Sequence, residues 1–220
     1  MKTEMKGGKK TDTDFYVQLV IIGILTLLIM FNVGRIYGSG GSVTEYGTGN
    51  AISISEIIPQ GIPAIYGKEL GVDYGDISPS NPRLADATIS KLSLSEDMEL
   101  TEAEKERYIK IAGSISCEYC CGADSIIFSN GERACGCAHS FAMRGVAKYL
   151  LRNHPDMSDD DILSELGKWK VLFFPGIHEA KAQVLESKGI DSKDYINLAS
   201  NLYRGIESGA SASGGMVGGC

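Results

Sequence analysis

The arrangement of hydrophobic and polar positions separates an uncharged apolar segment near the start of the chain from a second half with helical patterning. Residues 15–34 include no charged side chain, and a helix of that length would extend roughly 30 Å, the thickness of a bilayer core. A buried core helix or a cleaved signal peptide would also be apolar, but the apolar core of a signal peptide spans only about 7–15 residues. The pattern therefore predicts a retained transmembrane helix over residues 15–36.

The basic residues around this segment predict its orientation. After Arg35 the next basic residue is Lys68, whereas four lysines precede the segment: Lys2, Lys6, Lys9 and Lys10. Cytoplasmic flanks of membrane helices are enriched in Lys and Arg. We therefore expect a single-pass membrane protein with a cytoplasmic basic tail over residues 1–14 and an extracytoplasmic C-terminal domain.

Residues 37–100 have the composition of a connection. Residues 37–50 (YGSGGSVTEYGTGN) are typical of a flexible linker. Prolines then recur at positions where they would interrupt helices: Pro59, Pro63, Pro79 and Pro82. The sequence predicts a flexible and extended linker region up to residue 100.

Helical patterning begins at residue 101. Thr101 and Glu104 have the spacing of a capping box, and Ser158 precedes three aspartates that favour a helix N-terminus. Apolar residues at helical intervals predict further helices over residues 139–153, 159–174, 178–187 and 195–204. We expect a Cys-rich helical domain over residues 101–205, followed by a Gly/Ser-rich tail over residues 206–220.

Five of the six cysteines lie within residues 117–137, in the pattern C-x2-C-C-x13-C-x-C-x-His. Residues 125–128 are rich in β-branched and aromatic side chains, and Asn130-Gly131 is a turn signal, so a hairpin would bring the two cysteine clusters together. The expected fold class is mainly α, with an N-terminal transmembrane helix and a small helical domain containing a Cys-rich, zinc-finger-like β-hairpin.

Thiolates at this spacing predict a metal site. The predicted ligands are Cys117, Cys120, Cys135 and Cys137, with Cys121 and His139 as substitutes or supporting groups. Zinc is the expected ion because a closed all-thiolate site suits it, and copper or an iron–sulfur cluster are the alternatives. A C-x2-C knuckle followed by a hairpin and a helix resembles a treble-clef zinc finger.

Disulfides are the alternative use of these cysteines, because an exported domain meets an oxidising environment. The adjacent pair Cys120-Cys121 and the C-x-C pair suit bridging poorly, since short loops strain a disulfide. Cys220 follows a glycine-rich stretch and could fold back to the site, pair between chains or remain a free thiol.

A second resemblance favours redox chemistry. The order C-x2-C, Ser129-Asn130, Met143-Arg144 and then DDDIL with GKWKVLF resembles the membrane-anchored thiol-redox subunit of bacterial cytochrome c maturation. The resemblance implies a thiol–disulfide oxidoreductase with Cys117 and Cys120 as the redox pair, although Glu118 stands where that family has proline. Such an activity requires a cysteine of low pKa, for which Cys120 or Cys121 are the candidates. The motifs CEYCCG and CGCAHSFAMRG also resemble uncharacterised membrane-anchored proteins of an archaeal type, which implies no activity.

The charge balance excludes one class of partner. With 28 acidic and 21 basic residues the chain has a net charge of −7 and no basic stripe, which argues against nucleic-acid binding. The sequence therefore indicates a membrane-anchored metal-binding protein, acting as a metal carrier or holding a structural metal centre, with the membrane and a protein partner or thiol client as its contacts. A thiol–disulfide oxidoreductase and an assembly protein are the other two classes. The sequence does not specify the oligomeric state.

Overall fold

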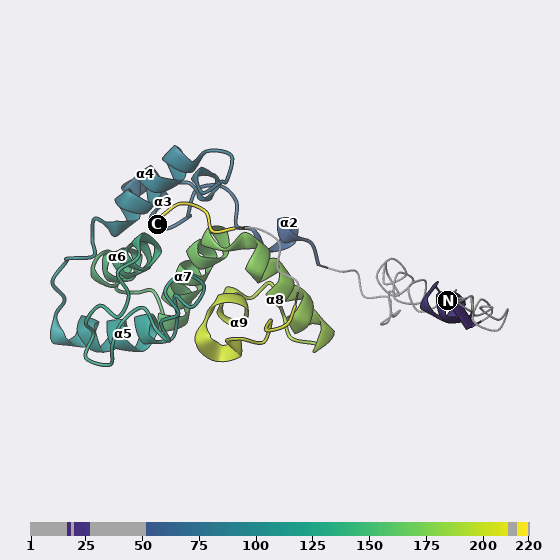
Figure 1. The fold of residues 1–220 in the computed structure, drawn as a ribbon. Helices are drawn as coiled ribbons and strands as arrows, with labels where there is room; N and C mark the ends of the chain where they lie inside the picture. The colour runs from purple at the N-terminus through teal and green to yellow at the C-terminus, as the bar shows by residue number, and fades with distance from the viewer. Residues whose placement is uncertain (1–16, 19, 27–51, 211–214, 220) are drawn as a thin grey trace, which may run out of the picture. The chain divides into compact units, whose positions relative to one another are not determined.

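The computed structural model describes residues 17–18, 20–26, 52–210 and 215–219, and the chain divides into two compact units, residues 1–50 and 51–220 (Figure 1). In the first unit the described residues are helical. The second unit consists of helices joined by loops. Its elements are α2 (Ile54–Ile57), α3 (Gly67–Leu70), the 3₁₀ turn η1 (Tyr74–Asp76), α4 (Pro82–Ser93), α5 (Glu102–Gly113), α6 (Ala138–Asn153), α7 (Asp159–Phe173), α8 (Pro175–Ser187), α9 (Tyr195–Ala199) and the 3₁₀ turn η2 (Asn201–Tyr203).

The expectation of a transmembrane helix is corrected by the structure. Within the described ranges, no helix has the length and apolar character needed to cross a membrane. A single-pass membrane protein with a cytoplasmic tail and an extracytoplasmic domain is therefore not supported. Residues 1–14 and the remainder of the predicted span (15, 16, 19 and 27–36) lie outside the described residues.

The predicted β-hairpin is also wrong, although the domain is mainly helical as expected. Among the described residues there is no β-strand. Two isolated antiparallel bridges, Cys117–Ala123 and Ile127–Arg133, hold the loop between the cysteine clusters. The carbonyls of Ile126 and Cys135 accept hydrogen bonds from the guanidinium of Arg144, each at 2.9 Å, and the N–H of Ile126 donates to the carbonyl of Ile115 at 3.0 Å. The loop is therefore fastened to helix α6 and not to a neighbouring strand.

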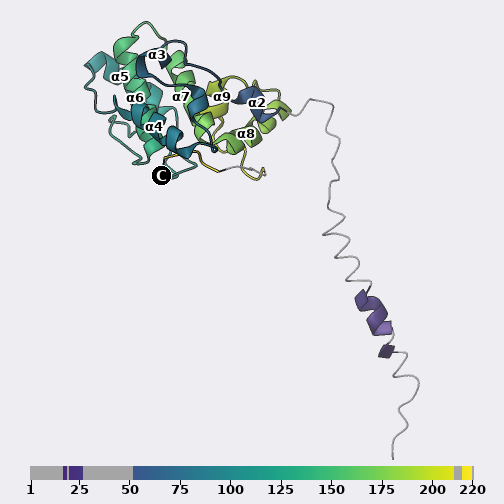
Figure 2. The ribbon, with the colours of Figure 1, turned by 90° about the horizontal axis from the view of Figure 1, so that it is seen from above.

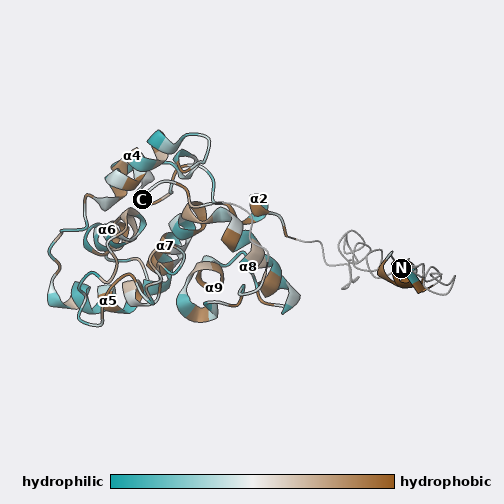
Figure 3. Cartoon of the chain, viewed as in Figure 1, coloured by the Kyte–Doolittle hydropathy of each residue, from teal (hydrophilic) through white to brown (hydrophobic). Residues whose placement is uncertain are grey.

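Helix α6 lies at the centre of the second unit and packs against α4, α5 and α7. It approaches α4 closely at Gly145, where a Cβ atom would lie 2.1 Å from the carbonyl oxygen of Leu92. The helices of this unit carry hydrophobic segments beside hydrophilic ones (Figure 3), and in α5 Tyr108 and Ile111 are buried. The capping boxes of α5 and α7 form at Thr101 and Ser158, so these two helices begin where the sequence indicates.

Residues 52–100 differ from the expected linker because they complete the core. Tyr66 and Tyr74 are buried and donate hydrogen bonds to Glu165 of α7 at 3.0 and 2.6 Å, and Trp169 donates to the Tyr66 hydroxyl at 2.7 Å. Pro82 occupies the first turn of α4, where proline is compatible with a helix, so it starts this helix and does not interrupt one.

Part of the expected tail is also packed. Within residues 215–219, Val217 is only 2% exposed, and its N–H donates to the carbonyl of Phe173 at 2.9 Å. Two views place the C-terminal end of the chain beside α4 and α6 (Figures 1 and 2). Residues 211–214 and Cys220 lie outside the described residues, and with them the expectations for Cys220.

Candidate metal centre

Two loops and one helix terminus bring the cysteine clusters together. After α5 the chain makes a tight turn in which the N–H groups of Cys120 and Cys121 both donate to the carbonyl of Cys117, at 3.3 and 3.2 Å. Gly122 then takes a left-handed conformation (φ 70°) that reverses the chain. The second cluster ends at Cys137, the N-cap residue of α6. The knuckle and the start of α6 therefore face each other.

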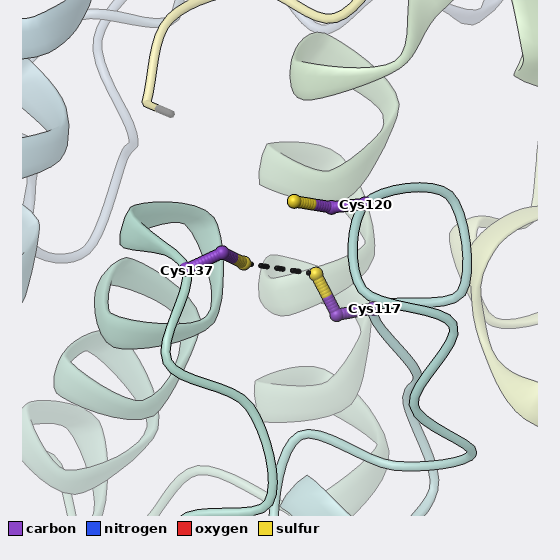
Figure 4. Close-up of side chains that lie close together, drawn as sticks. All are labelled: Cys117, Cys120 and Cys137. Carbon is purple, nitrogen blue, oxygen red and sulfur yellow. Dashed lines mark hydrogen bonds between the residues drawn. The ribbon is translucent and has the colours of Figure 1, made fainter.

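Three sulfurs converge at this point. The Sγ atoms of Cys117, Cys120 and Cys137 lie within 4.8 Å of one another, and those of Cys117 and Cys137 are 3.1 Å apart. Figure 4 shows the three side chains directed toward a common space. In a tetrahedral zinc–thiolate site, with bonds of about 2.3 Å, sulfurs lie roughly 3.8 Å apart. The observed cluster could therefore hold a metal ion after small side-chain adjustments.

The remaining two cysteines of the segment form a second pair. Cys121 and Cys135 are joined by a disulfide, and their sulfurs also lie within 4.8 Å of that of Cys117. Of the predicted ligands, Cys117, Cys120 and Cys137 therefore lie together, whereas Cys135 is bonded to Cys121. The sequence pattern offered no means of deciding which of the five cysteines would pair.

The N-terminus of α6 favours a thiolate at Cys137. Its sulfur accepts a hydrogen bond from the N–H of Ser140 at 3.4 Å, and helix N-termini attract negative charge. The hydrogen bond with Cys117, helped by His139 and Ser140, lowers the pKa of Cys137 to about 3, although burial opposes the shift. The same hydrogen bond and burial raise the pKa of Cys117. The two residues therefore share one proton, held by Cys117, and Cys137 takes the place of Cys120 or Cys121 as the low-pKa thiol.

His139 supports the cluster from the first turn of α6. It is fully buried, its ring packs 4.4 Å from that of Phe173, and its Nε2 lies 3.0 Å from the carbonyl oxygen of Val217. Its Nδ1 has no hydrogen-bond partner. Val217 bonds one ring nitrogen, and the His139 side chain contributes to the lowered pKa of the Cys137 thiol. His139 is not among the residues whose ligand atoms meet at the sulfur cluster.

A buried lysine lies behind the knuckle, and the sequence analysis did not identify it. Lys170 of α7 is fully buried and donates to Ser116, Glu118 and the carbonyl of Ala199, at 3.2, 3.2 and 2.9 Å. Burial lowers the pKa of this ammonium group to about 8, against the opposing effect of Glu118. The sequence did contain a signal for the burial of Lys170. This residue follows Leu166 by four positions and precedes Phe173 by three, which places it on the apolar face of α7.

Comparison of the chain with protein-family models, with curated proteins and with solved structures finds no match.

Proposed function

We propose that the protein binds a zinc ion through Cys117, Cys120 and Cys137. The observation that carries this proposal is the convergence of three sulfurs from two separate parts of the chain within 4.8 Å. Thiolates at this separation suit a tetrahedral ion, and zinc is the common divalent ion for such ligands. Copper(I) and an iron–sulfur cluster share the ligand type and are distinguished by metal analysis.

The surroundings of the site favour metal exchange over a purely structural role. Cys120 and Cys137 are partly exposed, and Cys137 lines a cavity of ≈ 570 Å³ together with Gly136 and Ala138. An ion held there remains reachable from solvent, as a carrier requires. A structural centre is instead usually enclosed by its four ligands.

The test measures metal content in the full-length protein, purified without chelators and loaded with zinc under anaerobic conditions. We expect one equivalent of zinc, lost in Cys117→Ser and Cys137→Ser. The matched control is the double variant Cys121→Ser/Cys135→Ser, which removes two neighbouring cysteines and is expected to retain the metal. Wild-type protein that binds no zinc, copper or iron under these conditions contradicts the proposal.

A second function, thiol–disulfide exchange, is favoured by the pairing of a low-pKa Cys137 with a protonated Cys117 3.1 Å away. The Cys137 thiolate would attack a client disulfide, forming a mixed disulfide and releasing one client thiolate. Cys117 would then lose its proton and attack Cys137, which releases the second client thiolate and leaves a Cys117–Cys137 disulfide. The client gains the two electrons that the pair loses. The resemblance to the cytochrome c maturation subunit points to the same chemistry with Cys117 and Cys120.

The two functions separate in a trapping experiment. Cys117→Ala/Cys120→Ala should accumulate a mixed disulfide at Cys137 with a small aromatic disulfide as the client at a pH above about 9, where Cys137 ionises without the hydrogen bond from Cys117 and no neighbouring thiol of the cluster resolves it. Wild-type protein that neither reduces this client nor forms the Cys117–Cys137 bond on oxidation excludes exchange.

A further inference from the structure

We propose that reduction of the Cys121–Cys135 disulfide creates a second zinc site, formed by these two cysteines together with Cys117. Cys117 then binds both ions as a shared thiolate. The inference rests on the proposed zinc binding by Cys117, Cys120 and Cys137, and it adds a second ion whose binding depends on the redox state of the protein.

The sulfur atoms of the five cysteines form two groups that overlap at Cys117. In the described part of the chain, the Sγ atoms of Cys117, Cys120 and Cys137 lie within 4.8 Å of one another, and so do those of Cys117, Cys121 and Cys135. The second group therefore meets the same distance limit as the group to which we assign the zinc ion. A thiolate sulfur has several lone pairs and can bind two ions at once, so Cys117 can belong to both sites.

The backbone around the second group is held by contacts that do not involve the disulfide. The N–H of Cys121 donates to the carbonyl of Cys117 at 3.2 Å, and the carbonyl of Cys135 accepts from Arg144 at 2.9 Å. Cys117 also pairs with Ala123 in an antiparallel bridge. The three cysteines therefore stay together when the disulfide is broken.

The separation of Cys121 and Cys135 suits a metal ion as well as a disulfide. Their Cα atoms are 6.7 Å apart. Sulfurs bound to one tetrahedral zinc ion lie roughly 3.8 Å apart. Once the disulfide bond is broken, rotation about the Cα–Cβ bonds separates the two sulfurs to this distance while the backbone remains in place.

Cys121 is the point at which a reductant reaches the disulfide. It is exposed and lines a cavity of ≈ 480 Å³, whereas Cys135 is buried. One thiolate of a dithiol reductant attacks the sulfur of Cys121 and releases Cys135 as a thiolate, and the second reductant thiolate then releases Cys121. The reductant becomes a disulfide, and the two electrons that it loses convert the protein disulfide into two thiolates.

Charge permits two ions in the reduced cluster. Two divalent ions bring four positive charges to the five thiolates. Lys170, the buried cation behind the knuckle, interacts electrostatically with Cys117 and supplies a further positive charge. The cluster with both ions is therefore close to neutral, as the burial of Cys117 and Cys135 requires.

The test measures zinc content and free thiols in the full-length protein, with and without prior treatment with a dithiol reductant. The reductant is removed by desalting before zinc is added under anaerobic conditions, and a second desalting step removes weakly bound zinc. We expect one equivalent of zinc in the untreated protein and two after reduction. The denatured, reduced protein should show two more free thiols per chain, from Cys121 and Cys135.

Three variants distinguish a shared site from independent binding. Cys121→Ser/Cys135→Ser should hold one zinc ion in both states. Cys137→Ser should hold none before reduction and one after it, because the second site remains complete. Cys117→Ser should hold none in either state, and circular dichroism should show all variants folded.

Wild-type protein that still holds one zinc ion after reduction overturns the inference and leaves the proposed zinc binding intact. A Cys117→Ser protein that gains an ion on reduction also overturns it, because Cys121 and Cys135 then bind zinc without the shared thiolate. So does a disulfide that the reductant does not cleave, since the second site then never forms. Wild-type protein that binds no zinc in either state overturns both proposals.

Discussion

The guanidinium of Arg144 lies 2.7 Å from the carboxylate of Glu96, and both side chains are buried. The same guanidinium donates to the carbonyls of Ile126 and Cys135, so a residue of α6 fastens the loop that separates the two cysteine clusters. It also lies 4.7 Å from the ring centre of Phe141, one turn earlier on the helix. This ion pair connects the stability of the core to the shape of the candidate metal centre.

Arg144→Met should therefore destabilise the fold by about 3–5 kcal/mol, because it leaves buried Glu96 with Arg133 as its remaining ion-pair partner and removes the side-chain donor to the carbonyls of Ile126 and Cys135. Denaturant unfolding of the metal-free protein measures this change. Arg83→Met, at an exposed position of α4, is the control and should change the stability by less than about 0.5 kcal/mol. Equal effects of the two substitutions would show that the buried pair does not stabilise the fold.

Gly145→Ala tests the contact between α4 and α6. The added Cβ would lie 2.1 Å from the backbone of Leu92, so the helices would have to separate, with an expected loss of at least about 1–3 kcal/mol. Gly113→Ala, at the end of α5, meets nothing within 4 Å and should be neutral or stabilising by up to about 1 kcal/mol. Thermal unfolding compares the two variants. A Gly145→Ala protein as stable as wild type would mean that the helices do not pack this closely.

The pKa of Lys170 predicts a pH dependence of stability. Because burial lowers this pKa from 10.5 to about 8, the unfolded state binds the proton more tightly than the folded state between these values. The contribution of Lys170 to stability should therefore rise with pH from about 8 to 10.5, by up to about 3 kcal/mol.

Lys170→Met removes this group, and groups that titrate similarly in both proteins cancel in the comparison with wild type. Unfolding of both metal-free proteins across the interval measures the difference. Parallel pH profiles would mean that Lys170 is not desolvated as the structure indicates.

The pKa of Cys137 predicts a thiolate in the metal-free protein at neutral pH. Since its pKa is lowered to about 3, the ultraviolet absorbance of this thiolate should persist on acidification until the pH approaches that value. The thiolate stabilises the folded state fully above the ordinary thiol pKa of 9.0, and this stabilisation decreases as the pH falls toward 3.

Cys117→Ala removes the largest cause of the shift and should raise the pKa of Cys137 toward 9.0. Cys121→Ala/Cys135→Ala is the control and should retain the thiolate. Absence of a thiolate signal in wild-type protein at neutral pH, with Cys117 and Cys137 both reduced, contradicts the assignment.

Helices α5, α6 and α7 were predictable because their signals are local. The capping boxes at Thr101 and Ser158 involve residues three positions apart, and apolar periodicity identifies the face that becomes buried. The prediction failed where the deciding partner is distant in sequence. In the short β-rich run, for example, the N–H of Ile126 donates to Ile115 and its carbonyl accepts from Arg144. The misinterpretation of Pro82 as a helix breaker instead missed a local signal, since Asn81 caps α4 and Pro82 occupies its first turn.

The candidate site, like the fold, was predictable from the sequence only in part. The sequence alone determined that thiol chemistry is concentrated in residues 117–137, since cysteine spacing is a property of the chain itself. Only the tertiary structure decided that Cys137 approaches Cys117, that Cys135 pairs with Cys121, and that Val217 docks on His139. These relationships depend on how α6 packs against the knuckle and on which backbone N–H and carbonyl groups still need hydrogen-bond partners. Local sequence patterns do not predict that packing.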